Sequence, residues 1–167
     1  MYSSEFWNKI WSRKYERHNR RHQAIWEAVV SFMKGKVCDL GCGPAVMYEG
    51  KEVDLTGVDW SPEGLEQARL HFPNGKYVCS QVTDTGLPTS EFDTVIMCGL
   101  LDYFEDWNPV LSEAKRILKP NGKIIATLLY GFQGHLWTEE LAKSKHSVLS
   151  FRHITSNWYL VEIDTSN

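Results

Sequence analysis

Five short apolar stretches, separated by turn signals and helical patterns, constrain the fold of this chain more than any other feature. We expect strands at residues 37–40, 53–58, 76–82, 94–98 and 123–129. Near-continuous apolar strands that alternate with helices are typical of a parallel sheet with both faces covered. The sequence therefore predicts an α/β fold with a mostly parallel sheet.

The helices between these strands begin at recognisable signals. Ser61 precedes Pro62, and a serine cap followed by proline at the first helical position is typical of a helix start. Asn108–Pro109 predicts a second helix start, because apolar residues at helical spacing follow it. The segment between the first two strands is short, and we expect a helix of only about two turns there.

The C-terminal part of the chain has a different pattern. Residues 138–145 predict a short helix, and residues 147–151 and 158–163 predict two strands with a short connection. Parallel strands need a longer crossover, so a connection this short favours an antiparallel pair at the edge of the sheet.

The N-terminal segment, from residue 4 to about residue 33, is expected to be helical with a break near His18. Its basic stretch, Lys9 to His22, is interpreted as a solvated helix face, and contact with phosphates or an acidic substrate is the alternative. We expect Trp7 and Trp11 to pack on the sheet, and the alternative is that they roof a pocket.

Length and composition limit the classes of protein. A chain of 167 residues predicts a single domain. The net charge of -3 argues against a chain built as a whole for nucleic acid, and no apolar run approaches the ~20 residues that cross a membrane. The N-terminus lacks the apolar stretch of a secretion signal, and the cysteines lack metal-ligand spacing. We therefore expect a cytoplasmic protein with reduced cysteines and no metal.

The turn after the first predicted strand is the first candidate for a binding site. In an open parallel sheet, ligands bind at the carboxyl ends of the strands, where the strand order reverses. The turn contains Gly41 and Gly43, which let the backbone approach a ligand, and Asp39 lies two residues before the first glycine. Asp39 would repel a pyrophosphate, which argues against a nicotinamide-dependent reductase, but it would suit a ligand with an ammonium group.

Two further carboxylates follow neighbouring strands. Asp59 ends the second predicted strand, where a carboxylate can accept hydrogen bonds from both hydroxyls of a ribose. Asp84 follows the third strand, where a carboxylate or a backbone group suits an adenine amino group. For Asp84 an ordinary turn role is the alternative, because Asp-Thr-Gly is typical turn chemistry.

At four places the sequence resembles the class I S-adenosylmethionine-dependent methyltransferases: residues 37–43, 57–62, 87–93 and 116–123. The resemblance covers roughly residues 35 to 130. It implies a Rossmann-like three-layer sandwich, with a mostly parallel seven-stranded sheet whose last strand is antiparallel. It also implies S-adenosylmethionine as cofactor and S-adenosylhomocysteine as product. One departure is Ala45, which stands where many family members have a third glycine.

The resemblance further implies a set of cofactor-binding residues, most of them at or after strand ends: Asp39, Gly41, Cys42, Gly43, Asp59, Trp60, Thr83, Asp84, Cys98, Gly99, Leu100 and Tyr15. The residues of the first turn would contact the methionine part of the cofactor, and Asp59 would bind the ribose. Trp60 would lie beside the adenine, and Thr83 or Asp84 would meet its amino group. Tyr15, on the N-terminal helix, would close over the cofactor.

No residue is identified as a catalytic base. His135 follows the fifth strand, and Asp102 and Tyr103 follow the fourth, near where family members place their substrates. For each of these residues a structural role is the alternative. The expected mechanism is direct in-line displacement, in which alignment of the acceptor matters most and a base is optional.

We therefore expect one methyltransferase domain over residues 1–167, with a helical lid at 1–34, a cofactor-binding core at 35–130 and a substrate-side helix and edge strands at 131–167. The insertion after the fifth strand is small, which favours a small-molecule acceptor, methylated at oxygen or nitrogen. The alternatives are a non-catalytic or degenerate S-adenosylmethionine-binding protein and an RNA or protein methyltransferase. Neither the acceptor nor the oligomeric state has a signal in the sequence.

Overall fold

The computed structural model describes residues 3–12, 20–132, 138–145 and 148–166. The strands are β1 (Lys36–Leu40), β2 (Asp54–Asp59), β3 (Lys76–Cys79), β4 (Phe92–Cys98), β5 (Leu118–Leu129), β6 (Val148–Thr155) and β7 (Trp158–Ile163). The helices are α1 (Ser4–Trp11), α2 (Arg20–Val30), α3 (Pro62–His71), α4 (Asn108–Ile117) and α5 (Glu139–Lys145). Single 3-10 turns form at η1 (Val46–Tyr48) and η2 (Leu101–Tyr103).

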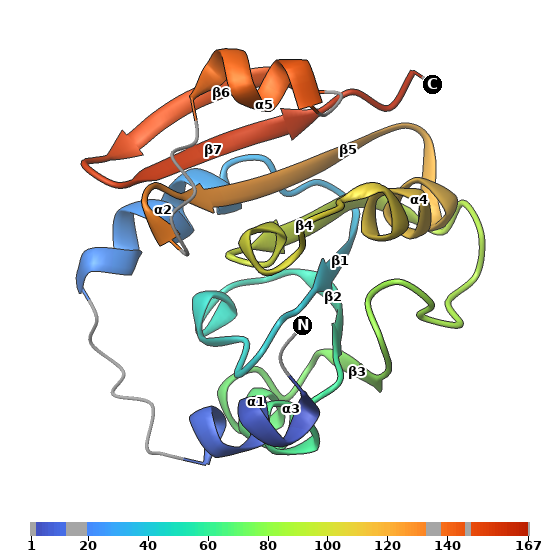
Figure 1. Cartoon of the computed structure of the whole chain (residues 1–167). Helices are drawn as coiled ribbons and strands as arrows, with labels where there is room; N and C mark the ends of the chain where they lie inside the picture. Colours follow the sequence, from blue (N-terminus) through green and yellow to red (C-terminus); the bar gives the residue numbers. More distant parts are fainter. Residues whose placement is uncertain (1–2, 13–19, 133–137, 146–147, 167) are drawn as a thin grey trace.

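The strands form a seven-stranded sheet in the order β3-β2-β1-β4-β5-β7-β6 (Figure 1). β7 runs antiparallel to both of its neighbours, and the other neighbouring pairs are parallel. The predicted α/β class and the antiparallel last strand are therefore confirmed. The strand order reverses between β1 and β4, so the carboxyl ends of these two strands are the place where a ligand is expected.

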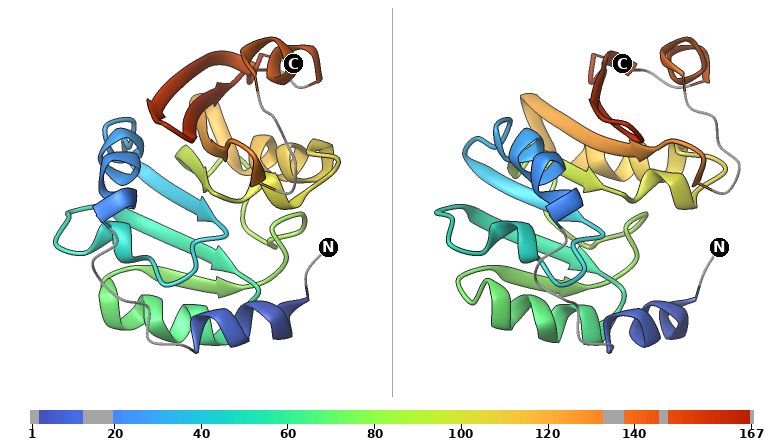
Figure 2. Two further views of the ribbon diagram at one scale, coloured as in Figure 1. Left: turned by 60° about the vertical axis from the view of Figure 1, so that its left-hand side comes forward. Right: turned by 90° about the vertical axis from the view of Figure 1, so that its left-hand side faces the viewer.

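The apolar side chains of the central strands alternate between two cores, as the period of a strand requires. On β4, Val95 and Met97 belong to the core that includes α4, whereas Ile96 belongs to the core that includes α2 and α3. On β5, Ile124 and Ile125 divide between the two cores in the same way. Helices α2 and α4 consequently lie on opposite faces of the sheet (Figure 2).

The connection between β1 and β2 differs from the expected two-turn helix. Only the 3-10 turn η1 forms there, so this expectation is wrong. Ala45 and Gly50, with φ of 54° and 73°, enclose η1, and residues in the left-handed region cannot continue a right-handed helix. Tyr48 is fully buried in this connection, and its ring packs 5.9 Å from the ring of Phe72.

Three strands, β3, β5 and β6, differ clearly from their predicted ranges, and β6 extends to Thr155 instead of ending at residue 151. β3 ends at Cys79, because the chain then folds into a turn closed by a bridge between Gln81 and Asp84. β5 begins earlier than expected, at Leu118, and includes Asn121 with φ of 64°. Asparagine adopts this left-handed conformation more readily than most residues, so the strand can include it.

The N-terminal segment contains two separate helices in the part that the structure describes. α1 lies alongside α3, and α2 packs on the sheet near β5, β6 and β7 (Figure 2). The expected helix break near His18 lies outside the described residues. None of the helices in the described part of the chain is long and apolar enough to cross a membrane.

Ser61 connects α3 to α1, and its replacement is expected to weaken both helices. The buried Ser61 hydroxyl accepts a hydrogen bond from Gly64 N (3.1 Å) and donates one to Asn8 Oδ1 (2.7 Å). Ser61→Ala removes the N-cap and should lower the free energy of unfolding by about 1 kcal/mol, measured by urea denaturation. Ser3→Ala, which removes an exposed cap hydrogen bond of 3.3 Å on α1, should have a smaller effect. Equal losses for the two variants would contradict the linking role.

Candidate functional site

A cavity of about 240 Å³ lies at the carboxyl ends of β1, β2 and β4. Its walls come from the turn after β1 (residues 41–47), the loop after β3 (81–83) and the segment after β4 (98–100 and 103–104). Helices α1 and α2 add three tryptophans, Trp7, Trp11 and Trp26. The cavity therefore occupies the edge at which the strand order reverses, and residues from distant parts of the sequence meet there.

The glycine-rich turn folds back onto β2. The backbone N–H groups of Gly41 and Cys42 both donate to the carbonyl oxygen of Val58, at 2.7 and 3.1 Å. Gly41 has φ of 75°, and a Cβ atom there would lie 2.9 Å from Leu100 Cδ1. The turn therefore needs glycine at this position for both its backbone conformation and the close approach of the segment after β4.

The side chain of Asp39 is buried, and only one of its two carboxylate oxygens has a hydrogen-bond partner among the described residues. Oδ2 accepts a hydrogen bond of 2.9 Å from the Tyr48 hydroxyl. Oδ1 has no hydrogen-bond partner among the described residues, although Asp39 lines the cavity. Burial raises the pKa of the Asp39 carboxyl to about 8; the Tyr48 hydrogen bond opposes this rise and the charge of Asp59 adds to it. A cationic donor in the cavity would satisfy this oxygen and favour the charged carboxylate.

Asp59 holds the turn and the start of α3 together. Its Oδ2 accepts a hydrogen bond from Gly43 N and its Oδ1 accepts one from Ser61 N, each 2.9 Å long. Burial raises the pKa of the Asp59 carboxyl, and these backbone hydrogen bonds lower it. Asp59 also lines the cavity, so its carboxylate is placed to accept from hydroxyl groups of a ligand as well.

Aromatic side chains form another part of the cavity wall, next to the glycine-rich turn. The rings of Trp7 and Trp11 on α1 stack at 5.9 Å, and Trp7 meets the edge of Tyr103 at 4.9 Å. Tyr103 in turn meets Phe132 at 4.9 Å. A Cβ atom on Gly43 would lie 2.9 Å from Trp11 Cζ2, so α1 rests directly on the turn. The two tryptophans of α1 line the cavity, which corresponds to the roofing alternative rather than to packing on the sheet.

Most of the residues expected to bind a cofactor line this cavity: Asp39, Gly41, Cys42, Gly43, Asp59, Trp60, Thr83, Cys98, Gly99 and Leu100. Asp84 is not among the lining residues, whereas its neighbours Gln81 and Val82 are. Of the two alternatives for this position, Thr83 lines the cavity and Asp84 does not. Tyr15 lies outside the described residues.

The three candidates for a catalytic base have different positions. Tyr103 lines the cavity. Asp102 is buried beside β5, where its Oδ2 accepts a hydrogen bond of 2.9 Å from Leu129 N, so its position corresponds to the structural alternative. His135 lies outside the described residues.

Sequence reasoning missed several residues of the site, among them Trp26, Gln81 and Tyr48. Trp26 and Gln81 line the cavity, and Tyr48 is the hydrogen-bond partner of Asp39. A buried tyrosine hydroxyl usually has a hydrogen-bond partner, and Tyr48 stands only nine residues after Asp39. This short separation is the one signal in the sequence that could have indicated the Tyr48–Asp39 hydrogen bond. Trp26 and Gln81 have no comparable signal, because their place depends on how α2 and the loop after β3 pack.

In the described part of the cavity wall, the charges have one sign. The charged side chains that line it are the carboxylates of Asp39 and Asp59, and tryptophan, tyrosine and phenylalanine rings provide much of the remaining wall. Both carboxylates and aromatic faces attract cations. Among the residues that the structure describes, no group of three or more His, Cys, Asp or Glu side chains is placed to hold a metal ion. The wall thus suits an organic cation that also carries a nucleoside.

Comparison with known proteins adds the family. Residues 38–126 match a family model described as a methyltransferase domain. A ubiquinone biosynthesis O-methyltransferase from Vibrio atlanticus is 31% identical over 111 residues, which are 61% of this chain and 47% of that protein. One from Coxiella burnetii is 27% identical over 138 residues, 72% of this chain and 59% of that protein. The chain thus spans about half the length of the curated relatives it matches.

Solved structures share the fold over nearly the whole chain. A Thermotoga maritima protein described as a possible histamine N-methyltransferase superposes with a TM-score of 0.74 at 16% identity, covering 98% of this chain and 97% of that one. A chain from a Haloferax volcanii complex of the Trm112 methyltransferase activator and a putative methyltransferase has a TM-score of 0.76 at 16% identity, with 99% and 98% covered. Similarity at this level of identity concerns the fold.

Proposed function

This chain belongs to the methyltransferase domain family of class I S-adenosylmethionine-dependent enzymes, and from that premise we propose that it methylates a small-molecule acceptor at an oxygen or nitrogen atom. The observation that supports a small acceptor is the composition of the cavity wall. The charged groups among its described residues are carboxylates and much of the rest is aromatic, so this wall would repel the phosphates of a nucleic acid and would bind an uncharged or cationic ring.

The cofactor implied by the family fits this wall. Asp39 would hold the ammonium group of the methionine part, because Oδ1 is buried and lacks a partner among the described residues. Asp59 would accept from the ribose hydroxyls, and residues 81–83 would contact the adenine. S-adenosylmethionine, when bound, supplies a methyl group that is already activated by its bond to a positively charged sulfur.

The protein's own contribution would be alignment of the acceptor and exclusion of water. Trp7, Tyr103 and Phe104 form an apolar wall next to the segment after β4, where the acceptor would lie. Aromatic walls of this kind orient a small ring and keep water away from the reacting atoms. Positioning of this kind does not require a base on the protein, because alignment alone lowers the barrier substantially.

The test is methyl transfer from labelled S-adenosylmethionine to a panel of small phenols and amines, with RNA and a protein mixture assayed in parallel. We expect labelled product and S-adenosylhomocysteine with members of the small-molecule panel. Transfer to RNA or protein with none to small molecules would overturn the proposed acceptor class. Tight binding of S-adenosylhomocysteine without transfer to any acceptor would favour a non-catalytic binding protein.

Tyr103 provides a specific test of the acceptor wall. Tyr103→Ala removes the ring that contacts Trp7 and Phe132, so the KM for the acceptor should rise about fivefold, which corresponds to an aromatic contact of about 1 kcal/mol. Tyr103→Phe keeps the ring and should leave KM and kcat nearly unchanged. A large loss of kcat in Tyr103→Phe would instead assign proton transfer to the hydroxyl. An equal loss of affinity for S-adenosylhomocysteine in Tyr103→Ala would place the ring against the cofactor.

A further inference from the structure

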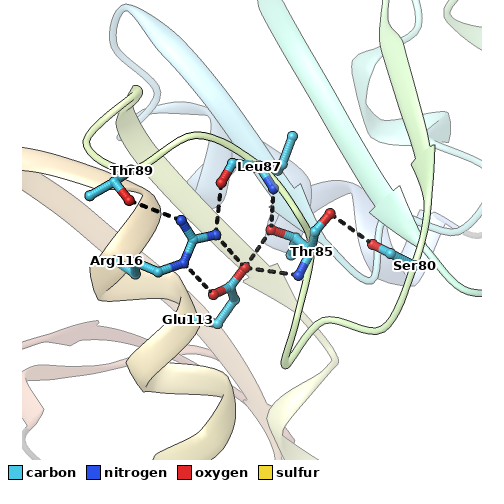
Figure 3. Close-up of polar contacts among 6 residues, drawn as sticks. All are labelled: Ser80, Thr85, Leu87, Thr89, Glu113 and Arg116. Atoms are coloured by element: carbon cyan, nitrogen blue, oxygen red, sulfur yellow. Dashed lines mark hydrogen bonds and ion pairs between the residues drawn. The ribbon is translucent and has the colours of Figure 1, made fainter.

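A buried carboxylate of α4 holds the loop between β3 and β4 (Figure 3). Glu113 lies on α4 and accepts hydrogen bonds from the backbone N–H of Thr85 (2.8 Å) and from the Thr85 hydroxyl. The same carboxylate accepts hydrogen bonds from Arg116 Nε (2.7 Å) and Nη2 (2.8 Å). Four donors therefore meet one carboxylate, which is about as many as a carboxylate can accept.

Arg116 extends this network along the second half of the loop. Its Nη2 donates to the carbonyl oxygen of Leu87 (2.8 Å), and its Nη1 donates to the Thr89 hydroxyl (3.1 Å). On the other side, the Ser80 hydroxyl donates to the carbonyl oxygen of Thr85 (3.4 Å). The loop is thus held at several points by Glu113 and Arg116 of α4, and at one more by Ser80 (Figure 3).

α4 is a rigid support for this network. Val110, Ala114 and Ile117 are fully buried in the core beneath it. Glu113 itself is only 6% exposed, and the Arg116 hydrogen bond, together with those from Thr85, lowers the pKa of its carboxyl to about 2 against the effect of burial. Glu113 is therefore charged at any pH at which the protein is studied, and its donors are fixed around it.

Thr85, the residue that Glu113 holds, lies next to the part of the loop that lines the cavity. Gln81, Val82 and Thr83 are lining residues. Asp84 N donates to the carbonyl oxygen of Gln81 (3.2 Å), which closes a tight turn directly before Thr85. The orientation of this turn, and so of the cavity wall that it forms, depends on where Thr85 is held.

We propose that Glu113 is a positioning residue that sets the cavity wall facing the adenine of the cofactor, and thereby determines nucleobase specificity. The inference rests on the proposed use of S-adenosylmethionine, and it concerns a residue outside the cavity. Glu113 is not among the lining residues, so it acts through Thr85 and the adjoining turn. Loosening the turn should weaken recognition of the 6-amino group of adenine more than binding of the methionine part.

The test compares two ligands by calorimetry. S-adenosylhomocysteine carries the 6-amino group, and S-inosylhomocysteine has an oxygen in its place. We expect wild-type protein to prefer the adenosyl compound by about tenfold or more, since a site built for a donor rejects the analogue that lacks it. Glu113→Gln keeps the side-chain size but leaves one acceptor oxygen for four donors, and it should reduce this preference to less than about threefold.

Glu162→Gln is the matched control. Glu162 accepts from Lys123 Nζ (2.7 Å) on the other side of the sheet, so its loss changes an ion pair without touching the loop, and the preference should stay unchanged. Thr85→Val removes the hydroxyl hydrogen bond to Glu113 and the one that the same hydroxyl accepts from Leu87 N (3.1 Å), but it keeps the bond from Thr85 N to Glu113. It is a milder second variant that should reduce the preference in the same direction.

The outcomes separate the two proposals. An unchanged preference in both Glu113→Gln and Thr85→Val, with lowered melting temperatures, would show a purely structural role and overturn the inference. Failure of the wild-type protein to bind either compound would overturn the proposed cofactor itself.

Discussion

Asp39→Asn is expected to stabilise the ligand-free protein while removing most of its affinity for S-adenosylhomocysteine. The pKa of the Asp39 carboxyl is raised to about 8 by burial, from 3.8 in the unfolded chain. When the pKa of a carboxyl is raised in the folded state, the free energy of unfolding falls as pH rises from about 4 towards 8, because folding then requires burial of the charge. At pH 7 the difference corresponds to up to about 4 kcal/mol, at about 1.4 kcal/mol per pH unit.

The asparagine side chain does not incur this loss, because it carries no charge and its oxygen can still accept from Tyr48. Urea denaturation at pH 5, 7 and 9 should show a wild-type stability that falls relative to Asp39→Asn as pH rises and levels off above about 8. Asp54→Asn, which removes a carboxylate that is about half exposed at the start of β2, is the control. It keeps Asp39, so the difference in stability between this variant and wild type should not change with pH. Equal stability of wild type and Asp39→Asn at pH 9 would contradict the assignment.

Binding should show the opposite dependence. If the ionised Asp39 holds the ammonium group of the ligand, calorimetric affinity for S-adenosylhomocysteine should rise up to about tenfold per pH unit between pH 5.5 and 7.5. The rise should end near pH 8, because the Asp39 carboxyl of the free protein is already largely ionised above its pKa of about 8. Asp39→Asn should bind ten- to hundredfold more weakly, a charged hydrogen bond contributing about 1.5–3 kcal/mol, and without this rising limb. An unchanged pH profile in the variant would assign the ammonium contact elsewhere.

The features of the fold that the sequence predicts are those with local causes. The start of α3 follows from the cap and proline at Ser61 and Pro62, and the serine hydroxyl does accept from Gly64 N. The strand alternation of β4 and β5 follows from burial on both faces. The turn η1 had no such local signal: it depends on Ala45 adopting a positive φ and on Tyr48 filling the space beside Phe72.

In the candidate site too, the residues with a local signal could be predicted from the sequence and those that depend on tertiary packing could not. Asp39, Gly41 and Asp59 could be placed from the sequence, because strand ends of a parallel sheet meet at one edge. The tryptophans of α1 could not be placed with them, since their position depends on α1 packing against α3 and on the lack of side chains at Gly43 and Gly64. The role of Glu113 also has no local signal, because its partner Thr85 lies 28 residues away.

Asp59→Ala is expected to reduce both stability and cofactor binding. The change leaves the N–H groups of Gly43 and Ser61 without their acceptor, and each such buried donor costs about 1–3 kcal/mol. The free energy of unfolding should therefore fall by about 2–4 kcal/mol, and the glycine-rich turn should lose its fixed orientation.

The two measurements together distinguish an anchor from a simple ligand contact. A residue that only bound the ribose would, on replacement, lower affinity for S-adenosylhomocysteine and leave urea denaturation unchanged. Asp106→Ala is the matched control, because Asp106 Oδ1 accepts one exposed backbone hydrogen bond, from Asn108 N (3.0 Å), outside the cavity wall. That variant should lose less than about 1 kcal/mol and bind normally. If Asp59 both holds the turn and accepts from the ligand, Asp59→Ala should lose stability and bind S-adenosylhomocysteine more than tenfold more weakly, and Asp106→Ala should show neither effect.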